Sequence, residues 1–154
     1  VTCDCAAVHH GVFNGSTWSF QSIVTDLRDY NQATRVAIGS DGTLHAAWRH
    51  LNWDAALSTY NLSLYYAAYR GGAWTQPEAL EVTQEFESVA VGVTGLGQPV
   101  LGWVDNPGSG LMSVYVSERS DIGWGPPTRC PPRGWNRSLP ETLSWLRGAL
   151  PASS

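Results

Sequence analysis

The most informative segment of the chain reads Val36-Ala37-Ile38-Gly39-Ser40-Asp41-Gly42-Thr43-Leu44-His45-Ala46-Ala47-Trp48. Apolar residues on both sides of Ser40-Asp41-Gly42 predict two short antiparallel strands, because serine, aspartate and glycine favour a tight turn. The pattern recurs downstream: Val89-Ala90-Val91-Gly92 follows 53 residues after its first copy, and Trp103 follows 55 residues after Trp48. A period near 50 residues indicates a fold built from repeated units.

The second half of each repeat shows the same periodicity. The segment that ends at Trp74 is echoed by the segment that ends at Trp124, 50 residues later. A third copy of this half alone ends at Trp18, 56 residues before Trp74. Because these tryptophans recur at equivalent places, as do Trp48 and Trp103, we expect them to pack between neighbouring repeats.

Each complete repeat divides into four short strands separated by turn-forming residues. The first repeat is expected to form strands at 34–39, 43–50, 62–70 and 73–81, and the second at 88–93, 98–104, 111–118 and 122–129. A longer loop is predicted over 51–60. One small twisted sheet cannot cover its own apolar faces, so repeats of this size favour radially arranged blades. The predicted fold class is all-β, with β-propeller-type four-stranded antiparallel blades.

The predicted organisation is one domain with two full blades and half of a third, which is an incomplete propeller. Its parts are an N-terminal half blade and connection over 1–33, full blades over 34–87 and 88–130, and a proline-rich connection with a short C-terminal helix over 131–154. Ser138 can cap a helix whose first turn contains Pro140, and leucines follow at helical spacing. We place this helix at 139–149.

Composition argues against several classes of partner. The net charge is −4 and the nine basic residues are scattered arginines with no lysine, which disfavours nucleic acid. No apolar run approaches the roughly 20 residues of a membrane span. Eight tryptophans and sixteen glycines suit pleated sheets joined by tight turns. We interpret the missing lysine as the codon bias of a GC-rich bacterial genome.

These residues resemble a known kind of blade. The segment 37–48, then Leu64-Tyr65-Tyr66-Ala67 and Gly71-Gly72-Ala73-Trp74-Thr75-Gln76-Pro77, is similar to blades of the sialidase-like (BNR repeat) propellers, and the similarity spans residues 7–130. The family's aspartate motif is matched only in part by Ser40-Asp41-Gly42-Thr43, and the second repeat has Thr94-Gly95-Leu96-Gly97 there. We interpret both segments as turns. The resemblance implies the blade type and no particular activity, because such blades occur in sialidases, lectins and other proteins.

The resemblance supplies no catalytic residue. A catalytic sialidase would need an arginine cluster for the substrate carboxylate, a tyrosine paired with a glutamate, and an acidic proton donor, gathered from many blades. Arg28, Arg49 and Arg70 fall at different strand positions, and no Arg-Ile-Pro segment is present. We therefore predict that the chain is not an enzyme by itself and that it needs no cofactor.

Three cysteines lie near the two ends of the repeat region. Cys3 or Cys5 could form a disulfide with Cys130 in an oxidising compartment, and the alternative is three unpaired thiols. The two N-terminal cysteines with His9 and His10 lack the spacing of a zinc site, and adjacent histidines on a strand point to opposite faces. No metal site is predicted, and we expect an extracellular or cell-surface location.

The propeller edge with the longer loops gathers aromatic and hydrogen-bonding side chains. Aromatic rings stack on the apolar faces of sugars, and amides or carboxylates pair with sugar hydroxyls. The ligand-binding candidates are Tyr30, Asn52, Trp53, Asp54, Tyr60, Asp105 and Asn106. Trp53 has no counterpart in the other repeat, which makes it a better candidate for an exposed contact than the recurring tryptophans. The alternative is that these residues belong to solvated loops of unequal length.

Three functions remain open from the sequence. The first is a noncatalytic propeller module that binds a glycan or a protein partner through the long-loop edge. The second is a fragment or subunit of a larger sialidase-like glycoside hydrolase, and the third is a structural subunit of a larger complex. Two and a half blades cannot close a ring of about four to eight, so we expect other copies or another chain to complete it.

Overall fold

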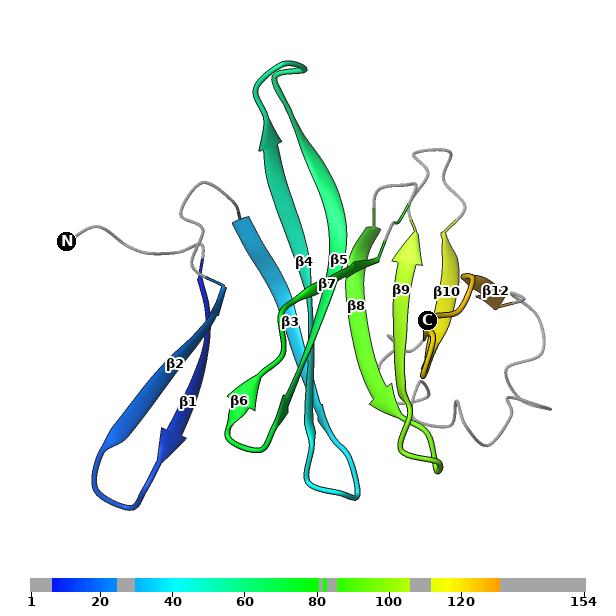
Figure 1. Ribbon diagram of the computed structural model, residues 1–154. Helices are drawn as coiled ribbons and strands as arrows, with labels where there is room; N and C mark the ends of the chain where they lie inside the picture. Colours follow the sequence, from blue (N-terminus) through cyan, green and yellow to red (C-terminus); the bar gives the residue numbers. More distant parts are fainter. Residues whose placement is uncertain (1–6, 25–29, 81, 83–85, 106–111, 131–154) are drawn as a thin grey trace, which may run out of the picture.

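The structure, a computed structural model, consists of three antiparallel sheets that follow one another along the chain (Figure 1). It describes residues 7–24, 30–80, 82, 86–105 and 112–130. These residues form twelve β-strands and no helix. The all-β prediction is therefore confirmed, whereas the helix predicted at 139–149 lies outside the described residues.

The first sheet is a hairpin, and the two larger sheets are meanders. The hairpin pairs β1 (Val8–Phe13) with β2 (Trp18–Val24). The middle sheet contains β3 (Tyr30–Ile38), β4 (Leu44–Asp54), β5 (Thr59–Arg70), β6 (Ala73–Trp74) and β7 (Glu78–Leu80). The third sheet contains β8 (Phe86–Val93), β9 (Pro99–Asp105), β10 (Ser113–Ser120), β11 (Gly123–Trp124) and β12 (Thr128–Cys130). Strands pair in sequence order, as predicted, with both short strands of each sheet on its third strand.

Prolines divide the outer strand of each larger sheet. Pro77 lies between β6 and β7, and Pro126 and Pro127 lie between β11 and β12. Proline has no N–H to donate to a neighbouring strand, so it interrupts the ladder of hydrogen bonds. The single fourth strands predicted at 73–81 and 122–129 are therefore each two short strands.

The turn after the first strand is the same in both larger sheets. Gly39 N–H donates to the carbonyl of Thr43 in the middle sheet, and Thr94 N–H donates to the carbonyl of Gln98 in the third, both at 2.8 Å. The Asp41 carboxylate accepts the N–H and the hydroxyl of Thr43 at 3.0 and 2.8 Å. Asp41 thus stabilises a turn, which confirms the interpretation made from the sequence.

The longer loop predicted over 51–60 is wrong. β4 and β5 stay paired as far as Asp54 and Thr59, so this region is an extended hairpin that projects beyond the other strands (Figure 1). The Asp54 carboxylate accepts the N–H of Ala56 at 2.9 Å and the N–H of Leu57 at 3.1 Å. Because this aspartate caps its own turn, a few residues suffice to reverse the chain, and the rest of the segment remains strand.

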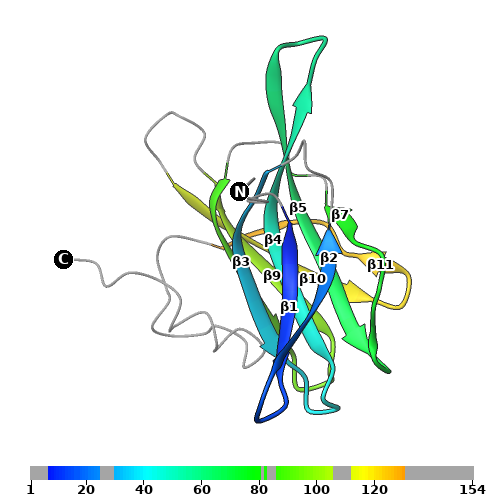
Figure 2. The ribbon, with the colours of Figure 1, turned by 90° about the vertical axis from the view of Figure 1, so that its left-hand side faces the viewer.

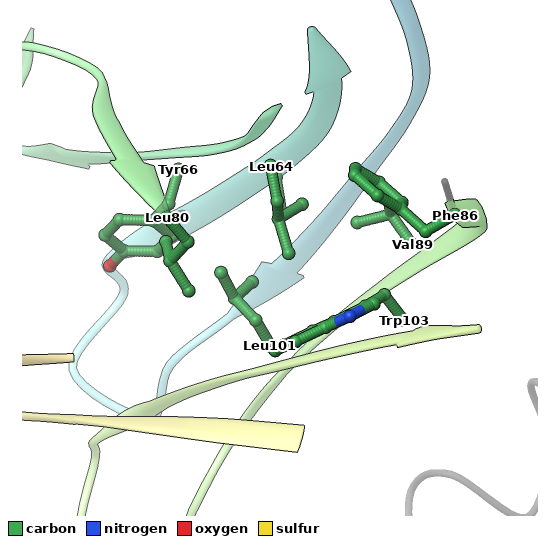
Figure 3. Close-up of a cluster of buried hydrophobic side chains, with 8 residues drawn as sticks. Leu64, Tyr66, Leu80, Phe86, Val89, Leu101 and Trp103 are labelled. Atoms are coloured by element: carbon green, nitrogen blue, oxygen red, sulfur yellow. The ribbon is translucent and has the colours of Figure 1, made fainter. Parts of the chain in front are cut away.

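Two apolar cores hold the three sheets face to face, and Figure 2 shows the sheets one behind another. The core between the middle and third sheets is formed by Ala47, Leu64, Tyr66, Leu80, Phe86, Val89, Leu101 and Trp103 (Figure 3). The core between the hairpin and the middle sheet is formed by Val8, Ala46, Trp48 and Ala67, with Ile23, Tyr65 and Trp74 partly buried beside them. The middle sheet is thereby covered on both faces, as a small sheet requires.

Trp48 and Trp103 are equivalent in structure as well as in sequence. Each faces the preceding sheet and stacks on a tyrosine of the next strand, Trp48 on Tyr65 and Trp103 on Tyr115, with ring centroids 5.9 and 6.0 Å apart. Their side chains are 0% and 5% exposed. Packing between repeats is therefore confirmed for these two tryptophans. Trp18 differs, because it is 61% exposed.

A second aromatic contact also repeats from sheet to sheet. Trp74 packs edge to face against His10 of the hairpin, with ring centroids 5.5 Å apart and an interplanar angle of 86°. Trp124 packs in the same way against Tyr66 of the middle sheet, at 5.0 Å and 81°. The hairpin is therefore related to the middle sheet as the middle sheet is related to the third.

Candidate functional site

Three exposed aromatic side chains lie together at the projecting end of the β4–β5 hairpin: Trp53 and Tyr60 of the hairpin, and Tyr30 at the start of β3. We call these three residues the aromatic tip. Trp53 and Tyr60 lie opposite each other with ring centroids 4.9 Å apart, and the ring of Tyr30, from β3, lies 5.5 Å from that of Tyr60. Desolvation raises the pKa of Tyr60, and its hydrogen bond with Tyr30 raises it further. Three of the predicted site residues thus meet in one patch.

The predicted polar residues lie on the opposite face of this hairpin. Asn52 and Asp54 alternate with Trp53 along β4, and neighbouring residues of a strand point to opposite faces. The Asn61 amide donates to Oδ2 of Asp54 at 3.3 Å. The Leu57 N–H and then this amide hold the pKa of Asp54 below its usual value, so its carboxylate is charged at neutral pH. Aromatic and polar groups therefore occupy two separate faces.

The remaining predicted ligand-binding residues do not join the aromatic tip. Asp105 ends β9, where it is 5% exposed and lies opposite Phe86 and Ser113 of the flanking strands. Asn106 lies outside the described residues. Of the predicted ligand-binding residues that the structure describes, all except Asp105 therefore lie at the end of the β4–β5 hairpin or, for Tyr30, on β3 beside it.

Cys130 ends β12, where burial raises the pKa of its thiol. Cys3 and Cys5 lie outside the described residues, so the disulfide between one of them and Cys130 stays a prediction. In the described ranges, no three histidine, cysteine, aspartate or glutamate side chains come together as metal ligands. No helix in those ranges has the length and hydropathy needed to cross a membrane.

A cavity of about 300 Å³ lies between the middle and third sheets, on the edge opposite the aromatic tip. This volume is at the lower end of small-molecule sites. Its polar lining includes Thr43, His45, Tyr66, Arg70, Glu78, Gln98, Arg119 and Asp121. These residues come from tight turns and strand ends of two different repeats, so no local pattern in the sequence indicated the cavity.

His45 and Tyr66 form a neutral pair in the wall of this cavity. Nδ1 of His45 and the hydroxyl of Tyr66 are hydrogen bonded at 2.7 Å. Desolvation lowers the pKa of His45, and desolvation raises the pKa of Tyr66 to about 12. Both side chains are therefore uncharged at neutral pH, and each satisfies the other's buried polar group.

Both arginines of the cavity lining are paired with carboxylates. Arg119 donates from Nε and Nη2 to the two carboxylate oxygens of Glu78, at 3.1 and 2.9 Å. Trp124 Nε1 donates to the same carboxylate at 3.1 Å. Arg70 Nη2 donates to the Asp41 carboxylate at 3.0 Å. Because both guanidinium groups already have a carboxylate, the cavity suits a small neutral molecule better than an anion.

Comparison with known proteins leaves the family open. The sequence matches none of the family models searched, and no curated protein is significantly similar to it. The resemblance to sialidase-like blades therefore stays a prediction from the sequence, and function is inferred from the geometry.

Proposed function

We propose that this chain is a noncatalytic binding module of β-propeller type and that its aromatic tip binds a glycan. The propeller arrangement is supported by the repeated relation between successive sheets. β8, the first strand of the third sheet, lies against β3 and β4 of the middle sheet. Sheets that are arranged radially around an axis come together at their first strands in this manner. Other copies or another chain would complete the ring.

The blades we propose are of the sialidase-like kind, without the hydrolase activity. The cavity holds residue types that a catalytic sialidase would need, but they are engaged with other groups. Glu78 is held by Arg119 rather than by a tyrosine, and Tyr66 is bonded to His45. Among the described lining residues, no guanidinium is left for a substrate carboxylate. This pairing supports a binding role over a hydrolase fragment.

The aromatic tip is the observation that carries the glycan proposal. Tyr30, Trp53 and Tyr60 are 47%, 45% and 41% exposed at the end of a hairpin that stands clear of both apolar cores. Exposed rings of this kind stack on the apolar faces of sugars, and tyrosine hydroxyls hydrogen bond to sugar hydroxyls. Neither core explains why the hairpin holds these rings in solvent.

A glycan array probed with the labelled chain tests this proposal. We expect Trp53→Ala to abolish glycan binding, because it removes the largest ring of the aromatic tip. The matched control is Ile122→Ala, which removes a 99% exposed apolar side chain on the opposite edge and should leave binding unchanged. Binding to no glycan, or binding that survives Trp53→Ala, would overturn the proposal.

A protein partner is the second candidate, and the two-faced hairpin favours it. Asn52, Asp54 and Asn61 line the face behind the aromatic tip, so the hairpin could insert between two surfaces of a partner. A photo-cross-linking group at position 57 tests this candidate. Cross-linking to a discrete protein that is lost in both Trp53→Ala and Asp54→Ala supports it, and cross-linking indifferent to both variants contradicts it.

A further inference from the structure

The cavity of about 300 Å³ between the middle and third sheets has walls that come from both sheets. On the middle sheet, β4 and β5 contribute His45, Tyr66 and Ala68. On the third sheet, Pro99 begins β9 and Arg119 lies near the end of β10. We call this space the inter-sheet cavity. A molecule inside it would contact two consecutive repeats at once.

The charges in the wall of the inter-sheet cavity balance one another. The wall contains two arginines, Arg70 and Arg119, and two acidic residues, Glu78 and Asp121. Arg119 is paired with Glu78, and Arg70 is paired with Asp41 of the neighbouring turn. An anion would have to displace a carboxylate to reach a guanidinium, and a cation would meet both guanidinium groups. The wall therefore favours an uncharged ligand.

The paired arginines keep N–H groups that an uncharged ligand can use. A guanidinium carries five N–H donors. Arg119 uses Nε and Nη2 for Glu78. Arg70 uses Nε for the hydroxyl of Thr43 and Nη2 for Asp41. Nη1 of each arginine makes no hydrogen bond to any residue that the structure describes, so oxygen atoms of a ligand can accept these N–H groups.

His45 adds a buried ring nitrogen with spare capacity. It is 4% exposed, and its Nδ1 is hydrogen bonded to the Tyr66 hydroxyl at 2.7 Å. Its Nε2 makes no hydrogen bond within the described part of the chain. Nε2 is a donor if Tyr66 donates to Nδ1, and an acceptor if Nδ1 donates to Tyr66. A ligand hydroxyl satisfies Nε2 in either case, because a hydroxyl both donates and accepts.

Small and apolar residues lie between these polar groups in the wall. They are Ala68, Gly97 and Pro99, which leave room for the C–H groups of a carbon skeleton. The volume of the cavity is at the lower end of small-molecule sites. A compact molecule with several hydroxyl groups matches this wall in size, in charge and in the alternation of polar and apolar contacts.

We propose that the inter-sheet cavity binds a small neutral polyol, no larger than a monosaccharide, whose hydroxyl groups contact His45 and the guanidinium groups of Arg70 and Arg119. The bound molecule ties the third sheet to the middle sheet. This site is separate from the aromatic tip, and the inference does not rest on the proposed function.

Titration of the whole, ¹⁵N-labelled chain with glycerol, xylose, glucose and galactose, followed by nuclear magnetic resonance, tests the site. At least one of these probes should shift the amide signals of Ser120 and Asp121 in the cavity wall, and the shifts should saturate. The same probe should raise the melting temperature, because only the folded chain has the cavity. The uronate and amino counterparts of a sugar that binds should bind roughly tenfold more weakly or less, since a charged group finds no free countercharge.

Two variants with matched controls locate the binding. Ala68→Leu fills the cavity and should abolish it, whereas Ala73→Leu, at an exposed alanine outside the wall, should leave it unchanged. Arg70→Met removes donors from a side chain that is 73% exposed, so it keeps the fold if Ala68→Leu does not. It should weaken binding roughly tenfold. Its control is Arg35→Met, at an exposed arginine that donates only to the carbonyl of Thr34.

The proposal is overturned if none of the four probes gives saturable shifts, or if binding persists in both Ala68→Leu and Arg70→Met. A charged counterpart that binds more tightly than the neutral sugar contradicts the proposed ligand class. Trp53→Ala should leave this binding intact, and a loss there would assign the sugar to the aromatic tip instead. An empty cavity in a chain that still binds glycans on the array would reject this site and leave the proposed function standing.

Discussion

Arg119 on β10 donates hydrogen bonds from Nε and Nη2 to both carboxylate oxygens of Glu78 on β7, at 3.1 and 2.9 Å. The two residues belong to neighbouring sheets, and the contact lies next to the apolar core between them. A bidentate pair between a planar guanidinium and a carboxylate fixes orientation as well as distance. This pair therefore sets how the third sheet sits on the middle sheet.

Glu78→Gln should lower the free energy of unfolding by about 1 kcal/mol, because it removes a charged pair that solvent screens only in part. A double-mutant cycle with Arg119→Gln in urea measures the coupling. The control is the pair of Arg70 and Asp41, whose side chains are 73% and 55% exposed and should show no measurable coupling. Equal couplings for the two pairs would contradict this expectation.

Trp48→Ala and Trp103→Ala should each lower the free energy of unfolding by about 3 to 5 kcal/mol, because each removes a large buried side chain and leaves a cavity in an apolar core. The two losses should be similar, since both side chains are buried at equivalent junctions. Chemical denaturation followed by far-ultraviolet circular dichroism measures them, with Ile122→Ala as an exposed control. A large loss at only one of the two positions would show that the junctions are not equivalent.

Stability should fall as the pH drops below the ordinary histidine pKa of about 6.5, in part because of His45. Desolvation lowers the pKa of His45 in the folded chain, so the unfolded chain takes up this proton first. His45→Gln should weaken the pH dependence between pH 7 and 5, by at most about 1.4 kcal/mol per pH unit. Unfolding titrations at a series of pH values test this, and identical profiles for the two proteins would refute it.

Val36→Thr and Ile38→Thr should leave stability unchanged within about 0.5 kcal/mol and reduce aggregation. The side chains of Val36 and Ile38 are 61% and 68% exposed. They lie on β3, on the face of the middle sheet where the β1–β2 hairpin covers β4 and β5. Light scattering on heating measures aggregation. Val89→Thr is the control, since Val89 is 4% exposed in a core and its replacement should be clearly destabilising.

The repeated strands could be predicted because the residues that define them act locally. Gly42, Gly72 and Gly97 have φ values of 80°, 87° and 81°, which glycine adopts without strain. These glycines mark the turns, and the recurring tryptophans mark the strands between them. Because the turns between consecutive strands are short, the spacing of the turns was enough to predict that strands pair in sequence order.

The candidate site was predicted less completely, because its geometry depends on the hairpin. If 51–60 were a loop, the side chains of Asn52 and Trp53 could both contact the same ligand. On a paired strand, these neighbours point to opposite faces, and only the aromatic residues stay together. The cavity escaped prediction for a different reason. Glu78 and Arg119 lie 41 residues apart, and only the stacking of sheets brings them into contact.

The divided outer strands determine how these sheets can associate with other chains. β6 and β11 have two residues each and β7 and β12 three, with prolines between them. Such an edge offers few aligned N–H and carbonyl groups to template a foreign strand, so strand addition at this outer rim is disfavoured. At this rim, contacts with other molecules are therefore made through side chains, where recognition is selective.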